Sequence, residues 1–244
     1  MSNAFTVSVA QSPAPVPTRR TVDAFTRTWH ALLALSFVGA YVTAESEIFR
    51  LVHVSLGYIL GGLLVARVVW GCLGPRHARL MALWGKLRGW SDIVEGLRTG
   101  QASWRQAQNL YMVTSVVAVL LAIASVVLSG YVSDQEWTGD WMEDVHEFFG
   151  IFMLAAVLAH ISGVVVLSFV RGRNLAAHML TGRVEGKGPD LIQSNHGFWA
   201  ILLWVAVLSF GLWQWQQSTS PDISRSEVGA WLSSGKAQAS DDND

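Results

Sequence analysis

Five apolar segments dominate the sequence and restrict its fold more than any other feature. They cover about residues 25–43, 49–71, 110–130, 145–170 and 196–215. Each is close to the roughly 20 residues that a helix needs to cross the hydrocarbon core of a bilayer. A lipid-exposed span must satisfy its own backbone hydrogen bonds, which segments of this length do as helices. We therefore predict an all-α integral membrane protein with five transmembrane helices.

The composition supports a membrane location. Only 14% of the residues are charged and 51% are hydrophobic, whereas soluble domains carry about 25% charge. Half of the 12 Trp residues lie near predicted span ends, where aromatic side chains gather at membrane interfaces. These are Trp29, Trp70, Trp137, Trp141, Trp213 and Trp215. Basic and acidic residues balance, which argues against nucleic-acid binding, and nucleotide-binding or hydrolase motifs are absent.

The distribution of Lys and Arg predicts the orientation. The N-terminal tail and the segments 72–109 and 171–195 carry 13 of these residues, and the opposite side carries 3. By the positive-inside rule the N-terminus is cytoplasmic and the C-terminus periplasmic. We expect residues 1–22 to be a disordered cytoplasmic tail, 186–215 a linker and fifth transmembrane helix, and 216–244 a polar tail outside.

Four histidines lie inside or at the ends of the apolar segments: His30, His53, His146 and His160. An intramembrane His usually faces the bundle interior and has a partner there. His146 and His160 are 14 residues apart, almost four helical turns, so they share one face about 21 Å apart along the axis. That distance is too large for one metal ion, and two separate sites are required.

The predicted orientation pairs the histidines. His30 and His160 fall toward the cytoplasmic face, and His53 and His146 toward the outer face. Cys72 is the only cysteine, so a haem would be held without thioether links, as b-type haem. Two His ligands fill both axial positions and favour electron transfer over oxygen chemistry. We predict two haem b groups in a helical bundle.

Residues beside these histidines allow two interpretations each. Gly57, Gly61 and Gly150 follow ligand candidates at helical spacing, and could admit a porphyrin or serve helix packing. Arg67 stands 14 residues from His53, and could bind a haem propionate or extend to the interface.

Other polar positions carry weaker signals. We expect His77 and His178 to be solvated or to face lipid headgroups. We expect His196 to act at a helix start or interface in preference to a quinone headgroup. The outer connection is acidic, which the charge rule explains, although it could also steer a basic partner such as a soluble c-type cytochrome. Its residues are Asp134, Glu136, Asp140, Glu143, Asp144 and Glu147.

Several motifs are similar to those of the bacterial cytochrome b561 family. They are Arg27-Thr28-Trp29-His30-Ala31, His53 with Gly57, Arg67 with Trp70-Gly71 and Gly74-Pro75-Arg76, Asp144-Val145-His146-Glu147, and Ala159-His160 with Gly163. Residues from Arg173 to Arg183 resemble the cytochrome b subunits of nickel-iron hydrogenases in particular. The resemblance covers about residues 20–185.

The resemblance implies a four-helix core, residues 23–185, that binds two b-type haems in the bacterial inner membrane. Its axial histidines map onto His30, His53, His146 and His160. It also implies electron exchange between membrane quinone and a periplasmic redox subunit or c-type cytochrome. We expect quinone near His30, His160 and Arg171. The fifth span departs from the simplest family pattern and leaves the partner open.

Three alternatives remain at the sequence level. The chain could mainly anchor a peripheral redox subunit. It could be a superoxide:quinone oxidoreductase, although the acidic outer loop has the wrong charge to attract superoxide. A transporter could use the histidines as a relay without haem, but residues 151–159 between His146 and His160 offer no polar side chain.

Overall fold

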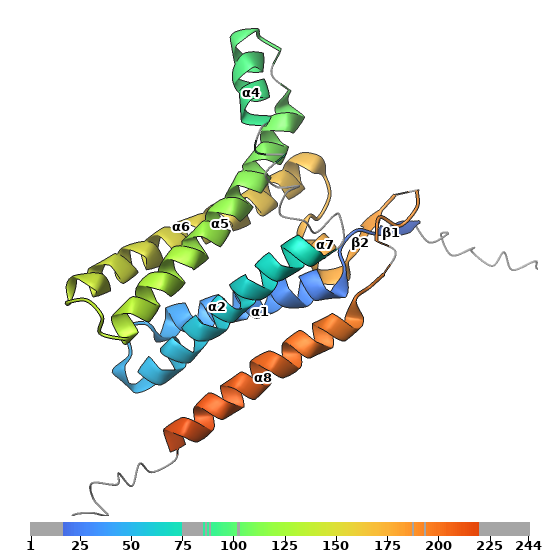
Figure 1. Ribbon diagram of the computed structural model, residues 1–244. Helices are drawn as coiled ribbons and strands as arrows, with labels where there is room; N and C mark the ends of the chain where they lie inside the picture. Colours follow the sequence, from blue (N-terminus) through green and yellow to red (C-terminus); the bar gives the residue numbers. More distant parts are fainter. Residues whose placement is uncertain are drawn as a thin grey trace, which may run out of the picture. The chain divides into compact units, whose positions relative to one another are not determined.

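The computed structural model is almost entirely helical (Figure 1). It describes residues 17–74, 85, 87, 89–101, 103–186, 188–192 and 194–219. The helices are α1 (Ala24–Thr43), η1 (Glu47–Phe49), α2 (Arg50–Leu73), α4 (Gly89–Arg98), α5 (Trp104–Asp134), α6 (Trp141–Arg171), α7 (Ala176–Thr181) and α8 (Gly197–Thr219). Two short strands, β1 (Thr18–Arg20) and β2 (Arg183–Glu185), complete the described elements.

Four of the described helices are long and apolar enough to cross a membrane. They are Glu47–Leu73, Trp104–Asp134, Trp141–Arg171 and Gly197–Gln217. Helix α1 is not among them, because polar side chains such as Arg27 and His30 interrupt its first half. The helical membrane class is therefore supported, while the count of five spans, including the fifth at the C-terminus, stays a prediction.

The chain forms two compact units, Met1–Trp204 and Val205–Asp244. The described part of the second unit is the continuation of α8 to Thr219, where Val205, Leu208, Leu212, Trp213 and Trp215 are exposed. Residues 216–219 are helical, and the polar tail predicted for 216–244 stays a prediction. Residues 220–244 lie outside the described residues.

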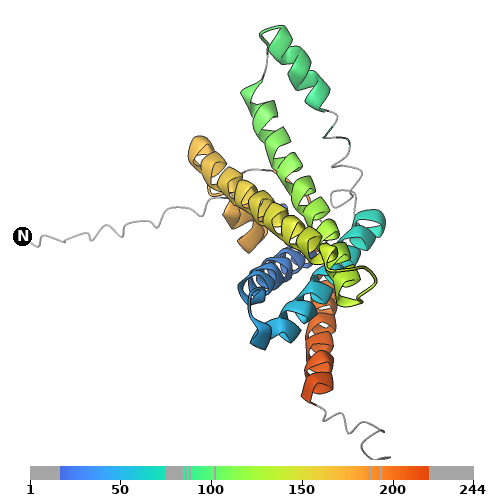
Figure 2. The same ribbon diagram turned by 90° about the vertical axis from the view of Figure 1, so that its left-hand side faces the viewer.

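Within the first unit, α5 packs along α6, α1 along α2, and α2 against α5 (Figures 1 and 2). Glycines allow these helices to approach closely. A Cβ atom at Gly61 would lie 3.0 Å from Val127, and one at Gly163 would lie 2.3 Å from the Tyr111 ring. Gly61 therefore serves helix packing between α2 and α5.

The surface of α5 and α6 is apolar, as lipid contact requires. Leu128, Phe152, Val165 and Phe169 are exposed, whereas Ala122 and Ile123 are completely buried. Apolar side chains thus cover both the interior and the outer face, which is the pattern of a helix surrounded by hydrocarbon.

Residues 18–20 correct the expectation of a disordered tail through residue 22. They form strand β1, which pairs antiparallel with β2, with Thr18 opposite Glu185 and Arg20 opposite Arg183. The N-H of Arg20 also donates to Asp190 at 2.6 Å. Backbone pairing gives this segment the order that its composition does not indicate. Residues 1–16 lie outside the described residues.

The same region holds the start of α1 against the chain after α6. The Arg27 Nε donates to the Met179 carbonyl at 3.2 Å, and its guanidinium also donates to the Leu180 carbonyl. Gly182 has φ +73°, and a Cβ there would lie 2.7 Å from the Val22 carbonyl. Only glycine fits this left-handed, crowded position, which explains the glycine between Thr181 and Arg183.

Candidate functional site

His53 and His146 face each other between α2 and α6. Their ring centroids are 6.0 Å apart and their planes make an angle of 90°. His53 lies in the first turn of α2, and His146 lies in the second turn of α6. Two residues separated by 93 positions thus meet at one level of the bundle, which we call the His53–His146 level.

Hydrogen bonds fix which nitrogen of each ring carries the proton. The His53 Nδ1 lies 2.8 Å from the Ala40 carbonyl, and the His146 Nδ1 lies 3.1 Å from the Val126 carbonyl. A carbonyl only accepts, so both Nδ1 atoms are N-H donors. The Nε2 atom of each neutral ring then keeps its lone pair, which is the form that binds a metal.

This arrangement fits a haem iron held between two imidazoles. A ring nitrogen binds a transition metal at about 2.0–2.1 Å, which places the centroids of two opposed rings roughly 6 Å apart. The observed separation agrees, and the carbonyls that accept from the two Nδ1 atoms would hold both rings in a fixed orientation.

His30 and His160 define a second level, the His30–His160 level. His30 lies in the second turn of α1, His160 lies 14 residues after His146 on α6, and both are half-buried. The two rings are close enough for a charge on one to act on the other. The His160 Nδ1 lies 3.2 Å from the Ser115 hydroxyl on α5.

The glycines differ in what surrounds them. A Cβ at Gly57 or Gly150 would meet no atom within 4 Å, although both residues are half-buried. Each lies one helical turn after His53 or His146, respectively, so the space beside these two ligand candidates is open. A flat ring would use that space, in contrast to Gly61, which contacts Val127.

Arg67 has both an anionic neighbour and an aromatic one. Its guanidinium carbon lies 5.7 Å from the centroid of the Trp29 ring, within the range of a cation–π interaction. The charge of Asp23 attracts it as well. The carboxylate that an intramembrane Arg requires is thus present in the protein, at the start of α1.

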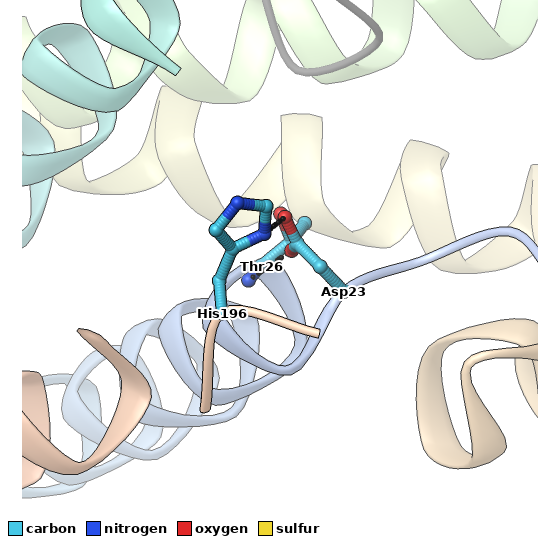
Figure 3. A network of polar contacts seen from close by, with 3 residues as sticks. All are labelled: Asp23, Thr26 and His196. Atoms are coloured by element: carbon cyan, nitrogen blue, oxygen red, sulfur yellow. Dashed lines mark hydrogen bonds and ion pairs between the residues drawn. The ribbon is translucent and has the colours of Figure 1, made fainter. Parts of the chain in front are cut away.

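Asp23 organises the end of the first unit where α1 and α8 begin (Figure 3). Its side chain is fully buried, and its Oδ1 accepts from the Thr26 N-H at 2.8 Å as the N-cap of α1. Its Oδ2 lies 3.3 Å from the Nδ1 of His196. The Trp70 ring packs on His196 with centroids 5.1 Å apart. His196 therefore stands at a helix start, as expected, but its ring faces a buried carboxylate.

Arg171 lies at the C-terminal end of α6, beyond His160. Its Nε donates to Gln108 at 3.1 Å, and its Nη2 donates to Asn109 at 3.0 Å. Both acceptors are neutral amides, so these contacts position the guanidinium without neutralising it. The positive charge also lies favourably near the negative end of the helix dipole.

The opposite end carries acidic and aromatic side chains. The Tyr58 hydroxyl donates to Asp134 at 2.8 Å, and the Tyr131 and Trp137 rings are 5.4 Å apart. Glu136, Asp140, Glu143, Asp144 and Glu147 are exposed. The acidic connection is therefore a solvent-facing surface close to the His53–His146 level.

The remaining predicted positions lie away from both levels. Burial lowers the pKa of His178 on α7, and the neighbouring charge of Arg173 lowers it further. His178 is thus partly covered and not fully solvated, and the alternative that it faces lipid headgroups stays a prediction. Cys72 is exposed and free, and His77 lies outside the described residues. Among the described residues, no three His, Cys, Asp or Glu side chains gather as a bare metal ion would require.

Sequence reasoning missed Ser115 and Ser129, which contact the two α6 histidines. It also missed Asp23. The serines carried a signal, since they are 14 residues apart on α5, like the histidines on α6. Asp23 also had one, because an Asp directly before a helical segment is a common N-cap.

Helices long enough to span a membrane, with two imidazole rings facing one another between them, define an integral membrane protein of the kind that binds haem inside a helical bundle. The model of the prokaryotic cytochrome b561 family matches residues 21–182. The chain belongs to this family, and is therefore a bacterial membrane b-type cytochrome that binds haem b and takes part in electron transfer. Comparisons with curated proteins and with solved structures gave no significant match.

Proposed function

We propose that the protein is a dihaem cytochrome that moves electrons between a redox partner at the outer face of the inner membrane and the quinone pool. His53 and His146 would ligate the outer haem, and His30 and His160 the cytoplasmic one. The proposal rests on the rings of His53 and His146, which face each other with their centroids 6.0 Å apart. Bound haem would supply one-electron redox chemistry, and these histidines would hold it in the bundle.

The residues around the rings would orient the ligands and leave room for the porphyrin. The carbonyls of Ala40 and Val126 hold the Nδ1 protons of His53 and His146. The open space at Gly57 and Gly150 lies where a ring would pass close to the backbone. Arg67 would bind a propionate of the cytoplasmic haem and share its charge with Asp23.

Quinone would react at the cytoplasmic end, near His30, His160 and Arg171. Arg171 is held by Gln108 and Asn109 and keeps its positive charge, so it can stabilise negative charge on a reduced headgroup. This proposal predicts that Arg171→Gln slows quinone-linked turnover while the haem spectrum is unchanged. Arg173→Gln, on an exposed neighbour outside α6, is the matched control.

The outer partner would be a periplasmic redox subunit, as in hydrogenase cytochrome b complexes, or a basic c-type cytochrome. The exposed carboxylates near the His53–His146 level support a positively charged docking surface on that partner. The same charge disfavours superoxide as the electron donor. The N-terminus would lie in the cytoplasm and the C-terminus in the periplasm.

The test is the reduced-minus-oxidised visible spectrum of the detergent-purified protein, with pyridine haemochrome quantification. We expect two low-spin b haems per chain, and the loss of one in His53→Ala or His146→Ala. His178→Ala, on α7 and outside both histidine pairs, should retain both. A wild-type chain with one haem or none would contradict the proposal. If His53→Ala loses its haem but keeps both subunit recruitment and turnover, the protein is mainly an anchor.

A further inference from the structure

Two serines on α5 contact the two histidines of α6. The Ser115 hydroxyl lies 3.2 Å from the His160 Nδ1, and the Ser129 hydroxyl lies 3.2 Å from the His146 Nδ1. Both serines are buried, with 7% and 6% of their surface exposed. Hydroxyls inside a membrane bundle need hydrogen-bond partners, and here the partners are candidate haem ligands.

The packing of α5 and α6 brings about both contacts. The helices are neighbours joined by a short turn, so they run antiparallel. A step of 14 residues along α5, from Ser115 to Ser129, therefore matches the step of 14 residues back along α6, from His160 to His146. Two steps of equal length keep one face of each helix in register. The same contact is thus repeated at each level.

The backbone carbonyls beside the two serines indicate the direction of these hydrogen bonds. The Ser115 Oγ donates to the Met112 carbonyl at 2.9 Å, and the Ser129 Oγ donates to the Val126 carbonyl at 3.2 Å. With its only proton used in this way, each hydroxyl oxygen accepts from the histidine Nδ1-H. Each serine therefore favours the tautomer whose Nε2 is available to iron.

The two levels differ in how many acceptors are available to the Nδ1 proton of the α6 histidine. The His146 Nδ1 has the Val126 carbonyl at 3.1 Å in addition to Ser129. For the His160 Nδ1, Ser115 is the acceptor that the described residues provide. Removing Ser129 would leave His146 with an acceptor, while removing Ser115 would leave His160 without one among these residues.

We infer that Ser115 and Ser129 are positioning residues that set the tautomer and basicity of His160 and His146, with His160 depending more strongly on its serine. This inference rests on the proposed ligation of haem by these histidines. An acceptor on Nδ1-H makes the imidazole a stronger electron donor, which stabilises the oxidised iron and lowers its reduction potential. Loss of the acceptor therefore raises the potential.

The experiment is a spectroscopic redox titration of the purified holoprotein and its Ser115→Ala and Ser129→Ala variants. In the wild type we expect two components. Ser115→Ala should raise the reduction potential of one component by about 28–59 mV, which is a threefold to tenfold change in the equilibrium constant of a one-electron reduction. Ser129→Ala should raise the reduction potential of the other component by a smaller amount, less than a threefold change in its equilibrium constant for reduction. Ser115→Thr, which keeps the hydroxyl, should restore the wild-type value.

Ser125→Ala is the matched control. Ser125 lies on α5 between the two serines and donates to its own helix, at the Leu121 carbonyl, so neither component should move. Unchanged potentials in Ser115→Ala, or the same component moving in both variants, would overturn the inference. Loss of a haem in Ser115→Ala but not in Ser115→Thr would support it, and loss in both would contradict it. A wild type without two haems would refute the proposed function itself.

Discussion

At the scale of single residues, the space beside the histidines depends on glycines with different surroundings. Gly130 touches the edge of the His146 ring, and a Cβ there would lie 2.8 Å from its Cε1. Gly57 lies beside open space, although it follows His53 by only one turn. The first glycine therefore sets the position of the His146 ring, while the second leaves open space that a cofactor would use.

Gly130→Ala should displace the His146 ring. The added methyl group must push the imidazole away, and overpacking of this kind costs about 1–3 kcal/mol. We expect the pyridine haemochrome assay to show loss or weakening of the outer haem, with the cytoplasmic haem retained. The control is Gly62→Ala, at an exposed position with no atom within 4 Å of an added Cβ. An unchanged haem content and spectrum in Gly130→Ala would contradict this assignment.

Gly57→Leu should reduce haem binding without preventing folding. The protein alone has room for the side chain, because no atom lies within 4 Å of a Cβ there, but the porphyrin would compete for that room. Helical content by circular dichroism should stay at the wild-type level while haem per chain falls. If Gly57→Leu retains as much haem as Gly62→Leu, the open space faces lipid and not the cofactor.

At the scale of elements, the start of α1 is joined to the start of α8 through one buried carboxylate. Asp23 caps α1 through Thr26 and faces His196 at 3.3 Å. Thr21 and Val22 donate to the Gly182 carbonyl, and Ala24 donates to the Asn195 carbonyl. The segments on both sides of the β1–β2 pair are thus connected to the helix that carries His30.

Asp23→Ala should destabilise the protein more than Asp23→Asn. Both remove the charge that faces His196 and Arg67, but Asn remains a good N-cap, and losing a cap costs about 0.5–2 kcal/mol. Thermal unfolding in detergent, followed by circular dichroism, measures the difference. Equal melting temperatures of the two variants would show that the cap contributes nothing. A variant doubly substituted as Asp23→Asn and His196→Gln should be less destabilised than the sum of the single changes, since the groups interact.

His178 should make stability depend on pH. Burial first, and Arg173 second, lower its pKa in the folded state, so between that value and about 6.5 the unfolded chain binds more protons. Stability therefore falls as the pH decreases below about 6.5. Melting temperatures at pH 7.5 and 5.5 should differ less in His178→Gln than in the wild type. Arg173→Gln should have the smaller effect, and an unchanged pH dependence in both variants would exclude this contribution.

At the scale of the whole molecule, charge is distributed unevenly along the direction that electrons would travel. Arg67 and Arg171 lie toward the end of the bundle that holds the His30–His160 level. Exposed carboxylates lie at the opposite end, in the connection between α5 and α6. In the proposed function, the first group would hold anionic parts of haem or quinone, and the second would attract a basic protein. Each end is therefore suited to a different kind of partner.

Electron transfer with a basic soluble c-type cytochrome should slow sharply as salt increases. Exposed charges are screened over about 10 Å at 0.1 M salt, which removes steering. Stopped-flow rates for the wild type and for Glu136→Gln with Asp140→Asn should converge at high salt, with the variant slower at low salt. Neutralising Asp92 and Glu95, exposed carboxylates on α4 at the end predicted to be cytoplasmic, serves as the control. Rates independent of salt would exclude a docking role.

The sequence by itself determined the membrane class, the long helices and the spacing of the candidate ligands, because hydropathy and helical periodicity are local properties of the chain. Even the shared face of His146 and His160 follows from the count of residues between them. Only the tertiary structure decided that His53 and His146 meet at 6.0 Å, that Ser115 and Ser129 contact His160 and His146, that Asp23 faces His196, and that residues 18–20 are paired. These contacts join residues distant in sequence, and they exist only after helices have packed in one register.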